Sequence, residues 1–397
     1  MIVYLAARPF LPPEDGWARR SAHVLRALAA VAPVRIVQVT GAPGLVRDSR
    51  FVPDGRVTVD VPGGRLAGRA TTVARSLAGD VPFQVARLAS DDVVRAIRDA
   101  CLAPTTRLVV ANTIVTAALV PDDLRVPLVI DTHNVDSLVA RRYAAVLPSR
   151  LERVAATMNV WQYERLERRF ARRAAEWWMC SEDDRQALDR VAGHVRATVL
   201  PNGVDTDEFT PGASRSGAPD LVFFGRLDYR PNTDAVRWLL ADIWPRIVAA
   251  RPDARLSIIG AGDMSAFADL VAATPGATLT GLVPDLAERL RRATLAVVPL
   301  RVGGGTRLKI LEAFAAGLPV VTTTIGVEGI PVVSGDEALV ADEPQSIADA
   351  VVTLLADPSR AATIGAAARR LVERRYAWRA IEARIAESVT HLLPDVT

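Results

Sequence analysis

The sequence predicts an α/β protein with two domains, on three observations. Short runs rich in Val, Ile and Leu alternate with longer helical patterns along the whole chain, which is typical of parallel strands joined by helices. The chain has 397 residues, of which 50% are hydrophobic, so it can bury two cores. Residues 201–219 are rich in turn-forming residues and have no periodic apolar face. We therefore expect two α/β domains joined near the middle of the chain.

The expected strands fall into two sets, one on each side of that segment. In the first half they are 2–6, 34–39, 107–111, 127–131 and 175–179, separated by helical patterns such as 17–31 and 149–173. In the second half they are 220–224, 255–259, 277–280, 295–298, 319–323 and 337–340.

The domain boundary is expected at the run Pro201-Asn202-Gly203-Val204-Asp205 and the Pro/Gly/Ser-rich residues 211–219. The N-terminal domain would then span 1–198 and the C-terminal domain 199–375. The remaining residues, 376–397, are helical in pattern over 376–395 and are expected to cross back to the first domain.

Composition narrows the class of protein. Met1 leads directly into an apolar strand, and no run of roughly 18 uncharged apolar residues is present, so we expect a soluble cytoplasmic protein. Cys101 and Cys180 belong to no paired motif, which predicts two buried apolar residues rather than a disulfide or a zinc site. The net charge is only +3, and no basic cluster accompanies exposed aromatics in a known module, so nucleic-acid binding is not expected.

The segment from Val297 to Pro319 has the order strand, glycine-rich loop, helix, stop. Its three glycines, Gly303, Gly304 and Gly305, would let the backbone approach a ligand closely. The helix that follows would present free N–H groups and the positive end of its dipole, which favours an anion. This segment therefore predicts a diphosphate site.

A polar stripe on the same helix strengthens this prediction. Thr306, Lys309 and Glu312 lie opposite an apolar face on a helical wheel. Lys309 would offer a compact charge to phosphate, Glu312 a bidentate acceptor to a ribose, and Arg307 could assist. The alternative is a surface pair of Lys309 and Glu312, worth about 0.2–0.5 kcal/mol. Because Lys309 is the single lysine among 48 basic residues, we favour the binding role.

This segment resembles the glycine-rich loop and Glu-Ala helix of the group 1 retaining glycosyltransferases of the GT-B fold, and in particular a branch with a triple glycine and Thr-Arg-Leu-Lys. The resemblance covers nearly all of 199–375 and, more weakly, the first half. It implies two Rossmann-like domains whose parallel sheets face each other across a cleft, with the acceptor bound by the first and a nucleotide-sugar donor by the second. Glu312 matches the second of two family glutamates, whereas Gly304 stands where the first would be.

A second matching element is the strand before Gly225-Arg226, in the run Leu221 to Asn232. The resemblance implies that Arg226 reaches the donor diphosphate, although it could instead cap a helix. The family often has a lysine five residues later, where this chain has Pro231, so that charge must come from Lys309, from Arg230 or from neither.

The first half offers two weaker features. Gly16 is the last residue of the run from Pro12, which lies between the first strand and a helix, where a sheet opens its ligand crevice. It could admit a sugar or phosphate, or belong to an ordinary loop. His133 follows strand 127–131 and resembles the family's histidine beside the donor sugar, although a lone loop histidine can be incidental. Asp131 could orient its ring, and Arg19 and Arg20 are available to acidic groups.

Residues 141–173 hold nine arginines and three glutamates interleaved with apolar side chains. Such a stretch could lie on an anionic membrane surface and serve a lipid-linked acceptor, or form the solvated face of an ordinary helix. The protein could thus be peripheral on the inner face of a membrane.

The resemblance implies a retaining, metal-independent glycosyltransferase that uses a UDP or GDP sugar, with no other cofactor. No Asp-x-Asp pair follows a strand. The acceptor would be a glycan, a lipid-linked sugar or a small metabolite, with polysaccharide biosynthesis the default. The implied catalytic residues are His133, Arg226 and Lys309. The implied donor-binding residues are Gly16, Gly225, Arg226, Gly303, Gly304, Gly305, Thr306, Arg307, Leu308, Lys309 and Glu312.

Three alternatives stay open. A nucleotide-sugar epimerase of similar fold and a non-catalytic nucleotide-sugar binding protein would both bind the donor without glycosylating an acceptor. A nicotinamide-dependent oxidoreductase is suggested by Gly260-Ala261-Gly262 after a strand. However, Ser265 stands where the third glycine belongs, and the next strand ends at Gly281 rather than at an acid.

Overall fold

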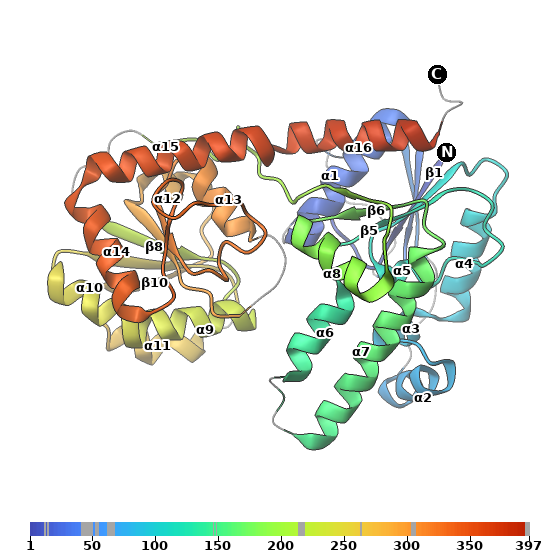
Figure 1. Ribbon diagram of the computed structural model, residues 1–397, viewed down its shortest axis with the longest axis horizontal. Coiled ribbons are helices and arrows are strands. Elements are labelled where there is room, and N and C mark those ends of the chain that lie inside the picture. Colours follow the sequence, from blue (N-terminus) through green and yellow to red (C-terminus); the bar gives the residue numbers. More distant parts are fainter. Residues whose placement is uncertain are drawn as a thin grey trace. The chain divides into compact units, whose positions relative to one another are not determined.

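The structure is a computed structural model that describes residues 1–11, 13, 16–40, 51, 55–61, 68–145, 147, 149–212, 219–262, 264–302 and 307–393. The chain divides into two compact units, each an α/β layer structure (Figure 1). Unit 1 comprises Met1–Pro201 and Ile381–Thr397, and unit 2 comprises Asn202–Ala380.

Unit 1 is built on a seven-stranded parallel sheet with the order β3-β2-β1-β4-β5-β6-β7. Its strands are β1 (Ile2–Ala6), β2 (Val34–Gln38), β3 (Val57–Asp60), β4 (Leu108–Ala111), β5 (Leu128–Asp131), β6 (Glu176–Met179) and β7 (Ala197–Val199). The strand order reverses between β1 and β4, which pair directly. At such a reversal the connections diverge and open a crevice at the carboxyl ends of the strands.

The two edge strands of this sheet lie outside the sequence prediction. β3 is half-buried to exposed and includes Thr58 and Asp60, and β7 is only three half-buried residues long. An edge strand is covered on fewer sides than a central one, so it does not need the continuous apolar run that marks the central strands. The other five strands match the expected ranges to within one residue.

Helices cover both faces of the sheet. They are α1 (Gly16–Val31), α2 (Arg69–Gly79), α3 (Phe83–Leu88), α4 (Asp91–Cys101), α5 (Ile114–Ala117), α6 (Asp136–Ala145), α7 (Arg150–Ala171) and α8 (Glu182–Ala192). The hydroxyls of Ser90, Ser149 and Ser181 accept an N–H from the first turn of α4, α7 and α8, respectively. Serine is favoured at this position because it satisfies an N–H that the helix leaves unpaired.

Unit 1 also receives the last helix of the chain, α16 (Trp378–Leu392), from Ile381 onward. Glu382 binds Nδ1 of His23 at 2.5 Å and the guanidinium of Arg26 at 2.7 Å. Ser388 accepts a hydrogen bond from Nε1 of Trp178 at 3.1 Å. Side chains from the start and the middle of the chain are thus satisfied by its final helix.

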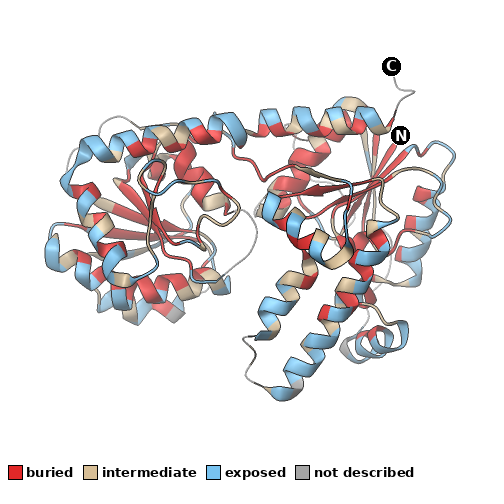
Figure 2. Ribbon diagram, in the orientation of Figure 1, coloured by how far each residue is buried: buried red, intermediate tan, exposed pale blue. Residues whose placement is uncertain are grey.

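Unit 2 has a six-stranded parallel sheet with the order β10-β9-β8-β11-β12-β13. Its strands are β8 (Asp220–Phe224), β9 (Arg255–Ile259), β10 (Ala277–Gly281), β11 (Leu295–Val298), β12 (Val320–Thr322) and β13 (Leu339–Val340). The order reverses between β8 and β11. The central strands of both sheets are buried (Figure 2).

The helices of unit 2 are α9 (Arg230–Trp238), α10 (Trp244–Ala250), α11 (Ser265–Ala272), α12 (Leu286–Arg292), α13 (Leu308–Ala315), α14 (Pro344–Ala356) and α15 (Pro358–Arg375). A π-helical turn, Leu239–Ile243, joins α9 to α10, and the N–H of Trp244 bonds five residues back to Leu239. Pro245 follows and has no N–H to donate, which explains why the α-helical ladder is interrupted here.

Helix α15 packs against the end of α13 without room for a side chain. A Cβ added to Gly365 of α15 would lie 2.3 Å from the carbonyl oxygen of Gly317. One turn later, Arg369 donates to the carbonyl oxygens of Ala315 and, at 2.5 Å, Phe209. These contacts fix the position of α13, the helix that carries Lys309 and Glu312.

We predict that Gly365→Ala lowers the stability of the protein. On the exposed face of a helix, replacing Gly by Ala stabilises the folded protein by about 1 kcal/mol. Here the new methyl group meets backbone atoms, and such overpacking destabilises the folded protein by about 1–3 kcal/mol. The measurement is the thermal midpoint and the denaturant midpoint of unfolding. The control is Gly79→Ala, where the nearest atom to the new Cβ is Val81 Cγ2 at 3.6 Å. Equal stability of the two variants would contradict the packing described.

Candidate functional site

The loops after β8 and β11 meet at the reversal of strand order in unit 2, where α/β sheets bind ligands. The first loop contains Gly225 and Arg226. The second includes Gly303, Gly304, Gly305 and Thr306, which lie outside the described residues.

Lys309 is held at this reversal by three contacts. Its Nζ donates to Oδ1 of Asn232 at 2.6 Å and lies 4.3 Å from the centroid of the Phe223 ring. A Cβ on Gly225 would come within 2.9 Å of the same Nζ, and Gly225 has φ +138°, so only glycine suits the position. Desolvation lowers the pKa of Lys309 to about 7, although Glu312 acts in the opposite direction. The structure thus brings together Lys309 and Gly225, two residues that the sequence analysis assigns to the donor site.

Asn232 is a residue of this site that the sequence analysis missed. It lies in the first turn of α9 and is buried, and its Nδ2 donates to the carbonyl oxygen of Arg226 at 2.7 Å. One amide group thus joins the Gly-Arg loop to the ammonium group of Lys309. The available signal was an amide residue directly after Pro231 at a helix start, but nothing local indicates its distant partner.

Arg226 lies on the surface beside this cluster. Its guanidinium forms a bidentate ion pair with Asp228, with Nε–Oδ1 at 3.0 Å and Nη2–Oδ2 at 2.5 Å. It therefore does not cap a helix through these contacts, and a phosphate approaching it would compete with Asp228.

The glycine pair after β9 has a packing role. A Cβ on Gly260 would lie 1.9 Å from the carbonyl oxygen of Gly225, and one on Gly262 would lie 2.7 Å from the backbone nitrogen of Asp228. Both glycines thus allow the loop after β9 to pack against the loop after β8. This contact accounts for the Gly-Ala-Gly spacing without a dinucleotide.

The other predicted residues of α13 differ in their surroundings. Glu312 is buried one turn after Lys309. Arg307, just before the helix, is also buried, and its Nη2 lies 3.3 Å from the carbonyl oxygen of Ile325 and 3.4 Å from Glu328. Leu308 packs on the core of unit 2. Its side chain is therefore structural, and only its backbone could take part in binding.

Apolar side chains surround the same end of the sheet. Tyr229, Met264, Leu282 and Val302 are exposed, and each lies within five residues after the end of β8, β9, β10 or β11, respectively. The carboxyl ends of parallel strands share one edge, so these side chains follow the same edge of the sheet as Gly225.

The reversal in unit 1 has its own cluster. The ring of His133 stacks on that of Trp17, with centroids 6.0 Å apart, and the guanidinium of Arg8 lies 4.3 Å from the Trp17 ring. Burial, with the charges of Arg20 and Arg8, holds the pKa of His133 well below its usual value. Its Nε2 is buried and finds no hydrogen-bond partner among the described residues. His133 is thus a neutral ring with an unused nitrogen. Gly16 begins α1 next to Trp17.

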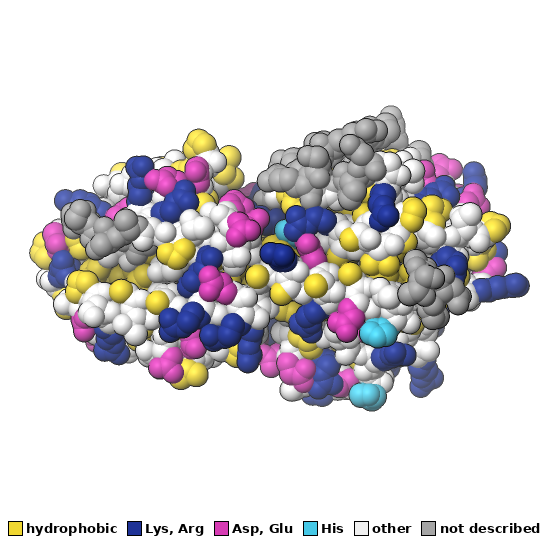
Figure 3. All heavy atoms as spheres, turned by 90° about the horizontal axis from the view of Figure 1, so that it is seen from above, with side chains coloured by type: hydrophobic (Ala, Val, Ile, Leu, Met, Phe, Trp, Pro, Cys, Tyr) yellow, Lys and Arg dark blue, Asp and Glu magenta, His cyan; other side chains and the backbone are white. Residues whose placement is uncertain are grey.

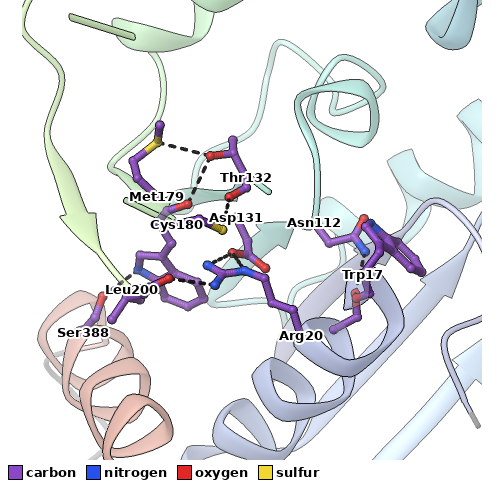
Figure 4. Close-up of polar contacts among 11 residues, drawn as sticks. Trp17, Arg20, Asn112, Asp131, Thr132, Met179, Cys180, Leu200 and Ser388 are labelled. Atoms are coloured by element: carbon purple, nitrogen blue, oxygen red, sulfur yellow. Dashed lines mark hydrogen bonds and ion pairs between the residues drawn. The ribbon is translucent and has the colours of Figure 1, made fainter. Parts of the chain in front are cut away.

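Two expectations for this unit are wrong. Arg20 is fully buried and is not available to a substrate: its Nε and Nη2 lie 2.9 and 2.6 Å from Oδ1 of Asp131, and its Nη1 donates to the carbonyl oxygen of Leu200 at 2.7 Å (Figure 4). Asp131 is therefore held by Arg20 and does not orient His133. An arginine and an aspartate so deeply buried require each other, because an unpaired charge in the interior is costly.

The basic residues 141–173 include the second half of α6 and all of α7, an antiparallel pair of helices in unit 1 (Figure 1). Several arginines in the second half of the stretch are in ion pairs, including Arg168 with Glu164 at 2.9 Å and Arg173 with Asp122 at 3.3 Å. Among the helices in the described part of the chain, none has the length and apolarity to cross a bilayer.

A pair of carboxyl groups lies where α6 meets α7. Oε1 of Glu167, which is buried, accepts the N–H of Ser137 at 3.1 Å. Burial and the proximity of Glu167 raise the pKa of Asp136 to about 7, and burial raises that of Glu167 to about 7.

The two cysteines, Cys101 and Cys180, are free and buried, as predicted.

Comparison with known proteins agrees with the resemblance seen in the sequence. Residues 218–357, most of unit 2, match the family model described as Glycosyl transferases group 1. A GDP-mannose-dependent monoacylated alpha-(1-6)-phosphatidylinositol monomannoside mannosyltransferase from Corynebacterium glutamicum is 29% identical over 47% of this chain and 54% of its own length. A GDP-mannose-dependent alpha-(1-6)-phosphatidylinositol monomannoside mannosyltransferase from Mycolicibacterium smegmatis is 32% identical over the same shares. The chain spans about half the length of these relatives.

Solved structures match over the whole chain. Sucrose-phosphate synthase from Thermosynechococcus elongatus has a TM-score of 0.75 to this chain and covers 99% of both chains, at 18% identity. A likeness at this level of identity concerns the fold. With the two parallel sheets described above, it confirms the GT-B fold that the sequence predicts.

We predict that Glu167→Gln stabilises the protein at alkaline pH and changes it little at acidic pH. A carboxyl with a higher pKa in the folded protein takes up a proton on folding, so its contribution is complete below the unfolded pKa of about 4 and is lost as the pH rises through about 7. Gln keeps an acceptor for Ser137 without the charge. The expected gain is about 1–3 kcal/mol near pH 8.

The measurement is the free energy of unfolding across this pH range. Glu387→Gln, on the exposed side of α16, is the control and should leave the pH dependence unchanged. A pH dependence that Glu167→Gln does not alter would show that this carboxyl titrates normally.

Proposed function

We propose that this chain, whose second unit is a group 1 glycosyltransferase domain, transfers a sugar from a nucleoside diphosphate donor to a hydroxyl acceptor. The observation that carries the proposal is the cluster of Lys309, Asn232 and Gly225 at the strand reversal of unit 2. An ammonium group is held there beside the start of α13, within the part of the chain that matches the family. The whole activity is a proposal, because the relatives are matched over only half of their length.

The proposed diphosphate site uses three sources of positive charge. Lys309 provides a point charge, Arg226 leaves Asp228 to bind phosphate, and the N-terminus of α13 adds free N–H groups. The predicted glycine loop, Gly303 to Gly305, would supply further backbone N–H groups. Glu312 accepts hydrogen bonds from the ribose hydroxyls. With this charge available, the proposed reaction needs no metal ion.

The proposed reaction retains the configuration of the donor sugar. The bond between the sugar and the diphosphate breaks, and the acceptor hydroxyl attacks the same face that the diphosphate leaves. A phosphate oxygen of the leaving group takes the hydroxyl proton, so no side chain acts as base. Lys309 and Arg226 stabilise the charge that grows on the leaving group, which is often the largest part of catalysis. His133, as a neutral ring, would bind a sugar hydroxyl through Nε2.

The proposed donors are UDP and GDP sugars, and the two mannosyltransferases compared above use GDP-mannose by name, which makes GDP the first nucleotide to test. Their names also include phosphatidylinositol mannosides, which supports a lipid-linked glycan as the acceptor class here. The work of such an enzyme is polysaccharide or glycolipid assembly, with the protein peripheral on the inner face of a membrane. Transfer of radiolabelled sugar to an acceptor separates this activity from epimerisation or donor binding alone.

The first test of the site is calorimetric titration of GDP, UDP and ADP in the presence of a chelator. We predict that one nucleotide binds and that Lys309→Ala and Glu312→Gln each weaken it by tenfold or more, about 1.4 kcal/mol, because each removes a direct contact. Arg374→Ala, on the exposed side of α15, is the charge control and should bind normally. Equal binding by all variants would make the polar stripe of α13 structural.

We also predict that diphosphate binding takes up a proton above neutral pH. Lys309 has a pKa of about 7 without ligand, and a bound diphosphate would raise it, so the ammonium group must form on binding when the pH is higher. Affinity should therefore fall as the pH rises above about 7. Titrations in buffers with different ionisation enthalpies measure the uptake. Lys309→Arg, whose charge is permanent, should abolish it while retaining more affinity than Lys309→Ala.

A further inference from the structure

Helix α2 exposes its two large apolar side chains and buries two of its hydroxyl side chains. Thr72 and Ser76 are buried, with hydroxyls that donate to the carbonyl oxygens of Gly68 at 2.9 Å and Val81 at 2.7 Å. Val73 and Leu77, by contrast, are 42% and 56% exposed. Because they are four residues apart, they share one side of the helix. A helix in water ordinarily has the opposite pattern, so the outer side of α2 is suited to an apolar neighbour.

Helix α7 has a matching stripe on its outer side. Val154 is 71% exposed and Trp161 is 50% exposed, and Met158 lies between them on the same side. The core side of the helix is separate and includes Tyr163 and Phe170, which are buried. The stripe is therefore not a part of the core that happens to be partly covered.

The stripe is bounded by arginines at both ends. Arg150 lies four residues before Val154, and Arg165 lies four residues after Trp161 with its guanidinium 5.7 Å from the indole ring. Arg150, at the start of α7, is exposed. Apolar side chains flanked by arginines are the pattern of a helix that lies on an anionic lipid surface.

The helices α2, α6 and α7 are neighbours in unit 1. Nε2 of Gln162 in α7 donates to the carbonyl oxygen of Ser76 in α2 at 3.3 Å, and Arg165 is ion-paired with Asp80 at the end of α2. An ion pair between Arg141 and Glu164 joins α6 to α7. We call this area the apolar–basic surface. Its members are Val73, Leu77, Tyr143, Arg150, Val154 and Trp161, together with Val139 and Met158.

The exposed apolar side chains of unit 1 are concentrated on these three helices. Of the nine large apolar side chains that are exposed in the described part of unit 1, seven lie on these three helices. The parts of α6 and α7 that lie away from the sheet are largely exposed (Figure 2). On the face of the molecule drawn in Figure 3, by comparison, acidic and basic side chains are interspersed, with scattered apolar groups between them.

We infer that the apolar–basic surface binds an anionic lipid bilayer, with the stripe of α7 in the interface and the arginines at the phosphate groups. A second copy of this chain is disfavoured as the occupant, because it would place the same arginines opposite one another. The inference rests on the proposed function only in its choice of a lipid-linked acceptor, which gives the protein a reason to be at a membrane. It also narrows the basic stretch 141–173 to the arginines beside the apolar stripe, Arg150 and Arg165, which excludes Arg168 and Arg173.

The test is flotation of the intact protein with vesicles of phosphatidylcholine, either pure or containing phosphatidylglycerol, at low and moderate salt. We expect binding to the anionic vesicles that weakens with salt. Val154→Ser with Trp161→Ser should reduce it by about tenfold or more, because both side chains lose apolar contact, and Arg150→Glu should reduce it on the anionic vesicles. Val94→Ser with Leu102→Ser is the control, since both residues are exposed apolar residues of unit 1 outside this surface.

Three results would overturn the inference: equal binding to neutral and anionic vesicles, unchanged binding by the Val154 and Trp161 variant, or no vesicle binding together with a dimer that this variant abolishes. Sedimentation analysis detects the dimer. Lys309→Ala should float like the unaltered protein, and the Val154 and Trp161 variant should still bind nucleotide. Failure of the donor site and failure of the lipid surface are thereby distinguished.

Discussion

Parallel pairing of the strands is the constraint on which the rest of this structure depends. A parallel strand cannot turn directly into its neighbour, so each strand is followed by a crossover. All carboxyl ends in one sheet then share an edge, and where the order reverses the crossovers diverge. In unit 2 this brings Gly225 and Lys309 together from segments far apart in the sequence. In unit 1 it brings His133 to Trp17 at the start of α1. The chemistry of both clusters is a result of the same topological rule.

The central strands and the glycine-loop helix could be predicted because their signals are local. An apolar run or a Gly-rich turn can be recognised from a few consecutive residues. The edge strand β7 and the role of the Asn232 amide cannot be recognised in this way. Asn232 contacts both Lys309 and the carbonyl oxygen of Arg226, and the proximity of these two residues is set by the sheet. Asp131 shows the opposite error: its position next to His133 in the sequence suggested a partnership, but the buried guanidinium of Arg20 is the stronger partner. Elements marked by local sequence patterns were predictable, while the partners of individual side chains required the structure.

Charge is used differently in the two units. In unit 1 a fully buried arginine and aspartate neutralise each other, which contributes to a fixed arrangement of α1, β5 and the segment ending at Leu200. In unit 2 the single lysine of the chain is desolvated, and its hydrogen-bond partner among the described residues is the amide of Asn232, with Glu312 one turn away. An ammonium group held in this way is ready to gain from an anion, whereas the paired arginine is not. The lysine of unit 2 thus differs from the arginine of unit 1 in having no carboxylate as its direct hydrogen-bond partner among the described residues.

The docking of α16 on unit 1 also affects how the chain can be made. A ribosome releases residues 1–201 first, and domains generally begin to fold as they emerge. His23 and Trp178, however, obtain their hydrogen-bond partners Glu382 and Ser388 only after all of unit 2 has been synthesised. The first unit to emerge is therefore the last to be completed, and its uncovered side must be protected in the interval. Translation speed through unit 2, or a chaperone acting during that time, would consequently influence the yield of unit 1.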